Sequence, residues 1–314
     1  MKKLVECVPN FSEGRDKQKI DDIVNHISTV SGIIVLDVDP GEDTNRTVVT
    51  IVGEPEALGE AAFQGIKRAS EILDMSQHTG THPRMGATDV CPFIPISGVS
   101  DEECIELSKD VGKRVGNELG IPIYLYEKSA QSDHRIKLPH IRKGEYEGLA
   151  NKLKDPKWQP DFGPAKFHKK AGASIIGCRE FLIAYNINLN TKDHRLATDI
   201  AFELREVGRS KRIPNPKSKN LLDGEIVRQK DGKPVKVPGM FNDVKGIGWY
   251  VDVFKRAQIS INFNNYKVST IHDVFDAACK LAEERGIRVT GSELVGLIPL
   301  EAMVMAGENY LKKK

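Results

Sequence analysis

The 314-residue sequence lacks the cysteine pattern of disulfide-rich and zinc-binding proteins. Its five cysteines are scattered along the chain, and no two of them have the Cys-x-x-Cys spacing of zinc sites and redox motifs. They are Cys7, Cys91, Cys104, Cys178 and Cys279. We therefore expect reduced thiols in a cytoplasmic protein, with neither a disulfide framework nor a zinc cluster.

Long apolar runs and a strong net charge are also missing. No run approaches the ~20 apolar residues that a membrane-spanning helix needs, and Glu6 follows Lys2 and Lys3 too closely for a signal-peptide core. The formal net charge is only +2, although 29% of the residues are charged. We expect neither a membrane nor a nucleic acid as a partner, and any basic binding site must be local.

What the chain does have is an ordered series of strand-like and helix-like segments, long enough for about two domains. Apolar residues at helical spacing predict helices over 15–30 and from Pro55 to Leu73. Alternating or continuous apolar runs predict strands at 2–8, 33–38, 47–52 and 90–96. The order strand-helix-strand-strand-helix-strand is typical of a ferredoxin-like unit.

The second half of the chain has the same order. Strands are expected at 181–189, 247–254, 258–264 and 287–290, and helices at 192–207, 271–285 and 300–311. Thr270 is the expected N-cap of the second of these helices. The fold class is therefore α/β, an α+β sandwich of two ferredoxin-like βαββαβ subdomains, residues 1–180 and 181–314.

Several expected features lie between these elements. Asp39-Pro40-Gly41 has the composition of a turn. Ser100 and Glu103 have the spacing of a capping box at the start of a helix over 101–118. A strand is expected at 121–126, an exposed helix at 140–155 and a loop at 156–173.

An insertion at 208–245 interrupts the second half. It contains ten Lys or Arg residues against four Asp or Glu residues, and four prolines. One interpretation is a solvated, partly mobile hairpin; the other is a basic flap that receives an acidic ligand tail.

The loop 78–89 concentrates polar chemistry between a helix and a strand. It reads His-Thr-Gly-Thr-His-Pro-Arg-Met-Gly-Ala-Thr-Asp, and its glycines and proline prevent a helix. His78 and His82 have the spacing of a helical zinc pair, but neither the helix nor the glutamate of such a motif is present, so we expect no metal. His82 is the better candidate for proton transfer, whereas His78 is expected to support the loop.

Other charged residues could assist a histidine there. The carboxylates of Asp37 and Asp39 could orient a histidine, bind a metal or stabilise a cationic substrate, although aspartate is also common in turns. Arg46 and Arg84 could clamp substrate carboxylates or form ordinary surface ion pairs. Ser12 could cap the first helix, whose start would also suit an anion.

Three separated motifs give the sequence a resemblance to a known family. They are VECVPNFSEGR at 5–15, HTGTHPRMGATDVCPFIP at 78–95, and the run from Gly163-Pro164 through Gly172-Ala173 to FLIAYNINL at 181–189. Together these motifs resemble the formiminotransferase family over essentially the whole chain. No cyclodeaminase domain follows them, so the resemblance implies a free-standing transferase.

The resemblance implies transfer of a formimino group from N-formimino-L-glutamate to N5 of tetrahydrofolate during histidine breakdown. It places the folate in a cleft between the two subdomains, in a homodimer, and it identifies His82 as the catalytic histidine. The folate-binding residues it implies are Gly163, Pro164, Ala165, Lys166, Phe167, His168, Lys169, Lys170, Ala171 and Gly172. Within this segment, Phe167 is the aromatic residue that could stack on the pterin.

A mechanism can be argued from the side chains. His82 would take a proton from the attacking nitrogen and return it to the departing glutamate nitrogen. Asp39 would favour the amidinium form of the donor, and Arg84 and Arg46 would bind its two carboxylates. Lysines of the folate segment and of the insertion would attract a polyglutamylated tail.

Other functions stay open at this point. The same scaffold could use N-formyl-L-glutamate or handle 5-formyltetrahydrofolate. A formyl group has an oxygen where the formimino group has a nitrogen, so a single hydrogen-bond donor in the pocket would decide which group is bound. The chain could instead be a non-catalytic folate-binding protein. A third hypothesis is a metal-dependent hydrolase that uses His78, His82 and the Asp37/Asp39 pair.

Overall fold

The computed structural model describes residues 2–218, 220–252 and 254–313. Lys219 of the expected insertion and Val253 of the expected strand 247–254 lie outside the described residues. The chain divides into two compact units, Met1–Arg179 and Glu180–Lys314, each with its own hydrophobic core. We call them unit 1 and unit 2.

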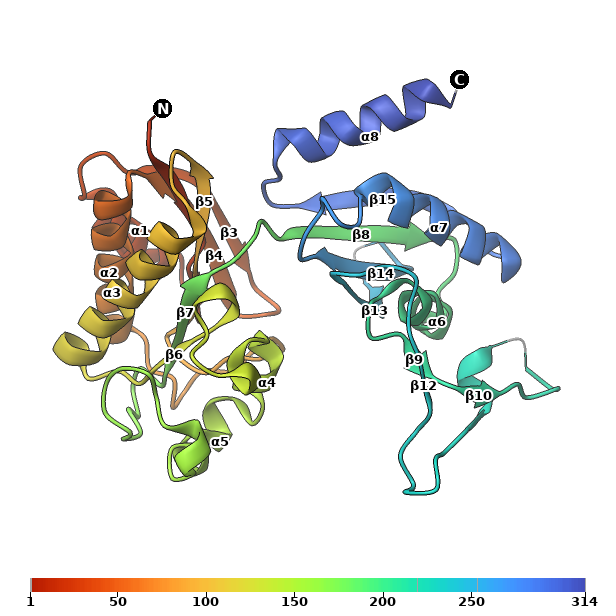
Figure 1. Cartoon of the computed structure of the whole chain (residues 1–314), viewed down its shortest axis with the longest axis horizontal. Coiled ribbons are helices and arrows are strands. Elements are labelled where there is room, and N and C mark those ends of the chain that lie inside the picture. The colour runs from red at the N-terminus through yellow and green to blue at the C-terminus, as the bar shows by residue number, and fades with distance from the viewer. Residues whose placement is uncertain (1, 219, 253, 314) are drawn as a thin grey trace. The chain divides into compact units, whose positions relative to one another are not determined.

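Unit 1 is built on a seven-stranded sheet (Figure 1). Its strands are β1 (Leu4–Cys7), β2 (Asn10–Phe11), β3 (Ile34–Gly41), β4 (Arg46–Gly53), β5 (Thr88–Ser97), β6 (Ile123–Leu125) and β7 (Ser174–Cys178). Strand β4 pairs with β3 on one side and with β1 and β2 on the other; β5 follows, then β7 and β6. The order β5-β1-β4-β3 is that of a ferredoxin-like sheet, so the predicted βαββαβ order is confirmed here.

Three long helices cover one face of this sheet (Figure 1). They are α1 (Lys17–Ser28), α2 (Pro55–Ile72) and α3 (Asp101–Leu119). The predicted apolar stripe of α2 is buried, because its residues recur on the side that faces the strands. The capping box is confirmed, since the Ser100 hydroxyl accepts from the Glu103 amide and the Glu103 carboxylate accepts from the Ser100 amide.

Two predictions for unit 1 are wrong, and one strand was not predicted. Strand β3 continues through the expected turn at 39–41, because it is an edge strand where the missing N–H of Pro40 costs no sheet hydrogen bond. The expected exposed helix at 140–155 is two helices, α4 (Leu138–Arg142) and α5 (Glu145–Lys152), and both have buried residues. The expected loop 156–173 is present, with one short 3₁₀ turn, and the unpredicted strand is β7, which follows the loop as a parallel neighbour of β5 and β6.

Unit 2 repeats the ferredoxin-like arrangement. Its main elements are β8 (Ile183–Leu189), α6 (His194–Leu204), β13 (Val244–Val251), β14 (Arg256–Phe263), α7 (Ile271–Glu284), β15 (Val289–Val295) and α8 (Leu300–Lys312). The sheet order β13-β14-β8-β15 again places the first strand between the third and the fourth. Thr270 caps α7 as predicted, by accepting from the Asp273 amide.

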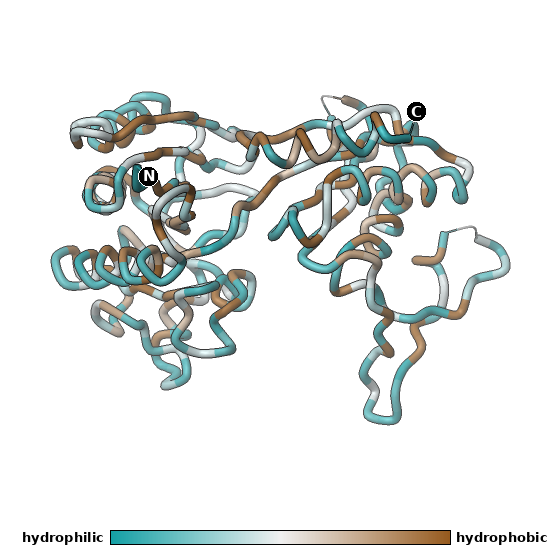
Figure 2. The backbone as a smooth tube through the Cα atoms, turned by 45° about the horizontal axis from the view of Figure 1, so that its top comes forward, coloured by the Kyte–Doolittle hydropathy of each residue, from teal (hydrophilic) through white to brown (hydrophobic). Residues whose placement is uncertain are grey.

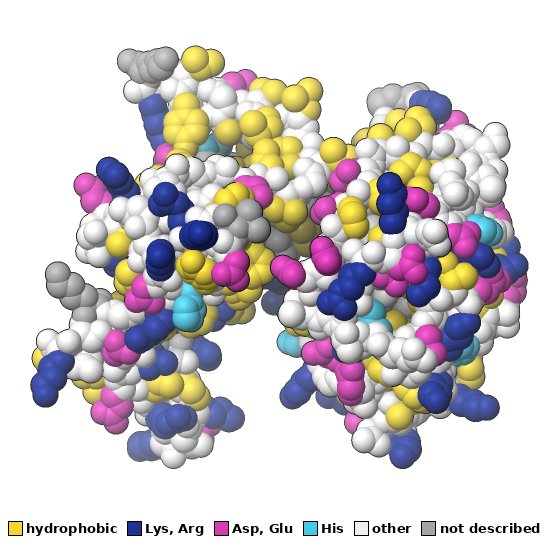
Figure 3. All heavy atoms as spheres, turned by 180° about the vertical axis from the view of Figure 1, so that it is seen from behind, with side chains coloured by type: hydrophobic (Ala, Val, Ile, Leu, Met, Phe, Trp, Pro, Cys, Tyr) yellow, Lys and Arg dark blue, Asp and Glu magenta, His cyan; other side chains and the backbone are white. Residues whose placement is uncertain are grey.

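The basic insertion forms a short arm of paired strands. These are β9 (Arg209–Ser210) with β12 (Lys236–Val237), and β10 (Arg212–Ile213) with β11 (Glu225–Ile226). Most of its residues are hydrophilic, and Lys and Arg side chains project from it (Figures 2 and 3). The arm therefore has the paired strands of the predicted hairpin.

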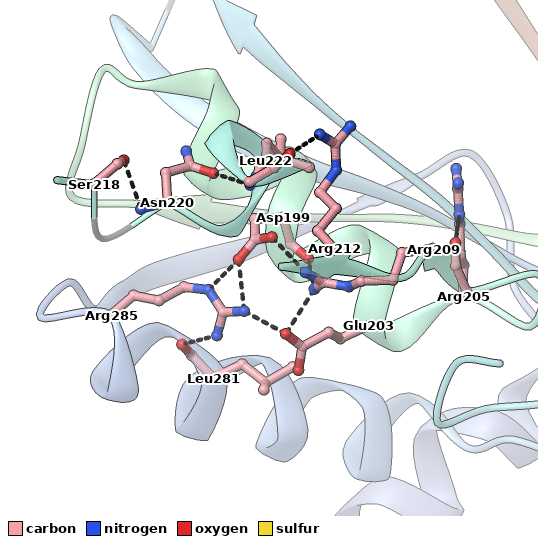
Figure 4. Close-up of polar contacts among 12 residues, drawn as sticks. Asp199, Glu203, Arg205, Arg209, Arg212, Ser218, Asn220, Leu222, Leu281 and Arg285 are labelled. Atoms are coloured by element: carbon pink, nitrogen blue, oxygen red, sulfur yellow. Dashed lines mark hydrogen bonds and ion pairs between the residues drawn. The ribbon is translucent and has the colours of Figure 1, made fainter. Parts of the chain in front are cut away.

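The base of this arm is anchored by an ion-pair network (Figure 4). Asp199 of α6 is buried and accepts hydrogen bonds from Arg209 of the arm at 2.7 Å and from Arg285 at 2.7 Å. Glu203 accepts from the same two guanidinium groups. Paired and hydrogen-bonded charges of this kind fix geometry, so the arm starts from a defined position on α6.

Candidate functional site

The histidine loop, residues 78–87, is fastened to the segment that resembles a folate-binding stretch. Gly86 and Gly172 form an antiparallel bridge. Next to it, the Ala87 amide donates to the Ala171 carbonyl at 2.9 Å. Two motifs that are far apart in the sequence are therefore neighbours in unit 1.

Both residues of this bridge require glycine. Gly172 has φ +68°, and a Cβ there would lie 2.1 Å from the Met85 carbonyl oxygen. A Cβ on Gly86 would lie 2.3 Å from the Ala173 carbonyl oxygen. Because backbone atoms cannot yield as a flexible side chain does, a larger residue at either position must move the two segments apart.

The first sequence motif, residues 5–15, is hydrogen-bonded to the histidine loop next to the Gly86–Gly172 bridge. The Ser12 hydroxyl donates to the Gly86 carbonyl at 2.7 Å, and the Ser12 amide donates to the Ala87 carbonyl at 2.9 Å. The proposed role of Ser12 as a helix cap is wrong, because Asp16 caps α1. Ser12 instead connects the first motif to the histidine loop.

Asn45 ties the loop to the strands from the other side. Its side chain accepts from the Gly14 amide at 2.9 Å and donates to the Thr79 carbonyl at 2.8 Å. Its own carbonyl accepts from Nε2 of His78 at 2.9 Å. Asn45 has φ +48°, in the left-handed region that asparagine tolerates, and the sequence carried no signal for this role.

His78 and Arg84 are hydrogen-bonded to each other, and Arg84 also pairs with α5. Nε of Arg84 donates to Nδ1 of His78 at 3.1 Å, so both ring nitrogens of His78 are used within the loop. The Arg84 guanidinium also pairs with Glu147 at 2.6 Å and with Glu145 at 3.1 Å. These contacts suit the supporting role expected of His78. Arg84 could clamp a substrate only by exchanging these partners.

His82 lies half-buried with its Nδ1 buried and without a well-formed hydrogen bond. Burial, followed by the positive charges of Arg46 and Arg142, lowers the pKa of His82 to about 4. Asp89 and the Pro83 backbone act in the opposite direction. The imidazole is therefore neutral at physiological pH and able to accept a proton.

Asp89 and Arg142 form the buried base of this site. The Asp89 side chain is fully buried; it accepts from the Met85 amide at 2.9 Å and from Nη2 of Arg142 at 2.5 Å. Sequence reasoning assigned no role to either residue. Asp89 ends the polar segment 78–89 of the sequence and lies in β5, whereas Arg142 comes from α4 and no local pattern connects it with the histidine.

Arg46 lies on β4 and donates to the Asn10 side chain at 2.6 Å. Burial, and then the charge of Arg142, lowers the pKa of Arg46 to about 10, while Asp89 and Asp39 act to raise it. Arg46 still carries its positive charge at neutral pH. The structure thus brings Arg46 and His82 into one electrostatic environment, and the role of Arg46 as a carboxylate clamp stays a prediction.

Asp39 is exposed on β3, opposite Val48 of β4 in the strand register. Its charge acts on Arg46, which places it at the edge of the same site. The catalytic role of Asp39 stays a prediction.

The folate-like segment presents a mixture of exposed and buried positions. Pro164, Ala165, Lys166, Lys169 and Lys170 are exposed, Gly163, Phe167 and His168 are half-buried, and Ala171 and Gly172 are buried. The ring of Phe167 packs against Tyr146, with 5.3 Å between the ring centroids. Stacking of a pterin on Phe167 would have to use the part of the ring that Tyr146 leaves free.

The hypothesis of a metal-dependent hydrolase requires a cluster of ligand side chains. Within residues 2–218, 220–252 and 254–313, no group of three or more His, Cys, Asp or Glu side chains has a metal-binding arrangement. Both nitrogens of His78 are also occupied by protein groups.

Among the residues that the structure describes, no helix has the length and apolar character needed to cross a membrane.

Fold and site together define a protein of two ferredoxin-like α/β units with a neutral histidine flanked by arginines. Residues 4–179 match the profile of the formiminotransferase domain, N-terminal subdomain, and residues 184–314 match that of the formiminotransferase domain. The chain belongs to the formiminotransferase family.

Named relatives agree with this assignment. The chain is 39% identical to a glutamate formimidoyltransferase of Streptococcus pyogenes serotype M1, over 99% of this chain and 94% of the relative. It is 40% identical to a glutamate formimidoyltransferase of Thermoplasma acidophilum, over 98% and 92%. A formimidoyltransferase-cyclodeaminase of Dictyostelium discoideum is 49% identical over 100% of this chain and 54% of the relative. The chain thus spans about half the length of the cyclodeaminase-containing relatives it matches.

Proposed function

We propose that this protein transfers the formimino group of N-formimino-L-glutamate to N5 of tetrahydrofolate, giving 5-formiminotetrahydrofolate and L-glutamate. The observation that carries the proposal is a neutral His82 in a loop that is bonded directly to the segment 163–172. Near-full-length similarity to two glutamate formimidoyltransferases supports it. The matches of units 1 and 2 to the two family profiles suit a pair of subdomains acting together.

The reaction needs a group that moves one proton. N5 of the folate attacks the amidine carbon of the donor, and a tetrahedral adduct forms with a new carbon–N5 bond. His82 accepts the proton that N5 loses and returns it to the glutamate nitrogen as the carbon–nitrogen bond to glutamate breaks. A neutral imidazole can do both, and such proton transfer contributes about 10²- to 10⁴-fold in rate.

Charged groups near His82 would bind and activate the donor. Asp39, exposed at the edge of the site, would favour the amidinium form, which is the better electrophile. Arg46 would bind a carboxylate of the glutamate portion through its planar guanidinium. Arg84 remains a candidate for the other carboxylate, provided that it exchanges Glu145 or Glu147 for the substrate.

The folate would lie along residues 163–172, next to the histidine loop. The exposed Lys166, Lys169 and Lys170 would attract the acidic tail, including a polyglutamylated one. The basic arm of unit 2 is a second candidate for tail binding. A cytoplasmic location and a homodimeric state complete the proposal.

A donor assay tests the proposal. N-formimino-L-glutamate and N-formyl-L-glutamate are each offered with tetrahydrofolate to the wild type, His82→Ala and a control, His26→Ala on α1. We expect turnover with the formimino donor and a loss of about 10²- to 10⁴-fold in His82→Ala, with tetrahydrofolate binding retained. His26→Ala should match the wild type.

Each alternative predicts a different result. Turnover with only the formyl donor would favour the formyltransferase, and folate binding without turnover of either donor would favour a non-catalytic protein. Equal turnover in the wild type and His82→Ala would contradict the proton-transfer role.

A further inference from the structure

Three residues connected with Asp89 each carry a buried polar atom without a hydrogen-bond partner: Thr88 precedes it in β5, Arg142 donates to it, and its charge acts on His82. The three atoms are Nδ1 of His82, Oγ1 of Thr88 and Nε of Arg142. Buried polar atoms are rarely left unpaired, and a catalytic or binding role is one of the explanations for such an atom. Arg142 also keeps 14% of its side chain exposed, and its charge acts on the imidazole of His82.

The positive charges at this point exceed the buried negative charge. The buried carboxylate of Asp89 pairs with Arg142 and balances one positive charge. In the part of the chain that the structure describes, Arg46 forms no ion pair, and its hydrogen-bond partner is the neutral side chain of Asn10. Each arginine is close enough to His82 to lower the pKa of the imidazole. Asp39 is exposed, so water and salt screen its charge.

We propose that Arg46 and Arg142 together bind one carboxylate of the amino-acid donor beside His82, with Asp89 fixing the orientation of Arg142. The inference rests on the proposed function and deepens it, because it names the residues that select a glutamate donor. It also gives Arg142 the carboxylate-binding role for which Arg84 would first have to leave Glu145 or Glu147. Two arginines and one buried carboxylate leave a single positive charge, which suits a carboxylate better than a doubly charged phosphate.

Binding of the donor would then change the chemistry of His82. The imidazole is a weak base in the free protein because the two arginines disfavour its protonated form. A carboxylate that neutralises them removes part of this effect, so the pKa of His82 rises toward neutrality when the site is filled. The base would thus gain strength when the donor is in place, which suits a group that must accept and return a proton.

The first test measures binding without turnover. Calorimetry with glutarate and with L-glutamate compares the wild type, Arg142→Lys and a matched control, Arg135→Lys. Arg135 is a similarly half-buried arginine of unit 1 that pairs with the half-buried Asp161 and also has an unpaired Nε, so it reports the general cost of such a change. We expect Arg142→Lys to bind glutarate about ten- to a hundredfold more weakly, and Arg135→Lys to bind it as the wild type does.

The second test follows His82 itself. NMR titration of its ring should give a higher pKa in the presence of glutarate than without it in the wild type, and a much smaller difference in Arg142→Lys. The double variant Arg142→Met/Asp89→Asn removes both charges together, so it leaves no unpaired buried carboxylate and guards against a failure to fold. It should also lose glutarate binding.

The outcomes separate this inference from the proposed function. Unchanged glutarate affinity in Arg142→Lys and the double variant, together with an unchanged titration of His82, would overturn the carboxylate site. A formimino-donor KM in Arg142→Lys equal to that of the wild type would do the same and leave the transferase intact. Glutarate binding that depends on Arg142, without turnover of any donor, would keep the site and remove the transferase.

Discussion

At the scale of single residues, the protonation of His82 depends on groups from three elements. Arg46 comes from β4, Asp89 from β5 and Arg142 from α4. A histidine in water would be partly charged near pH 6.5, but here burial and two positive charges keep the ring neutral. The burial and positive charges that keep His82 neutral therefore also lower the stability of the folded protein in acid.

We predict that His82 weakens the fold as the pH falls from about 6.5 to about 4. In this range the unfolded chain binds a proton at residue 82 and the folded chain does not, because the pKa in the folded state is about 4. The free energy of unfolding of the wild type should fall relative to that of His82→Gln by as much as roughly 3 kcal/mol. Urea unfolding of both proteins at several pH values measures this difference. A difference that does not vary between pH 7 and pH 4 would contradict the prediction.

The sequence singled out some residues of the candidate site and passed over others for a physical reason. His82 was identified because glycine and proline around it point to a braced loop. Arg142 was missed because its contact with Asp89 joins residues 53 positions apart, and no local spacing encodes such a contact. Arg84 was predicted as a substrate clamp from its place in the loop, yet its partners lie on α5, in a segment that the pattern described only as an exposed helix.

At the scale of elements, the connection between the histidine loop and the segment 163–172 depends on the backbone alone. We predict that Gly172→Ala will destabilise the protein more than Gly120→Ala. Both glycines have positive φ, but a Cβ at 172 meets the Met85 carbonyl, whereas a Cβ at 120 has no heavy atom within 4 Å. Gly120→Ala, the control, should lower the free energy of unfolding by about 1–2 kcal/mol because of its left-handed backbone, and Gly172→Ala should lower it clearly more.

Urea unfolding and tetrahydrofolate binding check this prediction. Gly172→Ala should also raise the Kd for tetrahydrofolate, since the two segments must separate to fit the new methyl group. Equal losses of stability in the two variants, with unchanged folate binding, would show that the bridge does not matter.

The elements that were predicted well carry their own signals. Helices α2 and α3 have apolar stripes at helical spacing, and α3 has a capping box, so local sequence is enough to place them. Strand β7 was missed because all five of its residues are buried between β5 and β6. A short strand that is buried on both faces shows no alternation and cannot be told from a loop or a buried helix by its pattern.

At the scale of the whole molecule, the two units have separate hydrophobic cores. Phe263 belongs to the core of unit 2 and Phe93 to that of unit 1, and both side chains are fully buried. We predict that Phe263→Ala and Phe93→Ala will each cost about 3–5 kcal/mol within their own unit. Hydrogen exchange on the full chain should show faster exchange in β8 and β13–β15 for the first variant, and in the strands of unit 1 for the second. Faster exchange of all strands in both variants would show that the cores unfold together.

The sequence by itself determined the order βαββαβ in both halves, because the period of apolar residues distinguishes strands from helices and each unit is built from neighbours along the chain. It also determined which loop carries the histidine. Only the tertiary structure decided which charges surround that histidine. Asp89, Arg142 and Arg46 come together through sheet pairing and helix packing, and a pKa depends on distance and burial in space, which no spacing along the chain specifies.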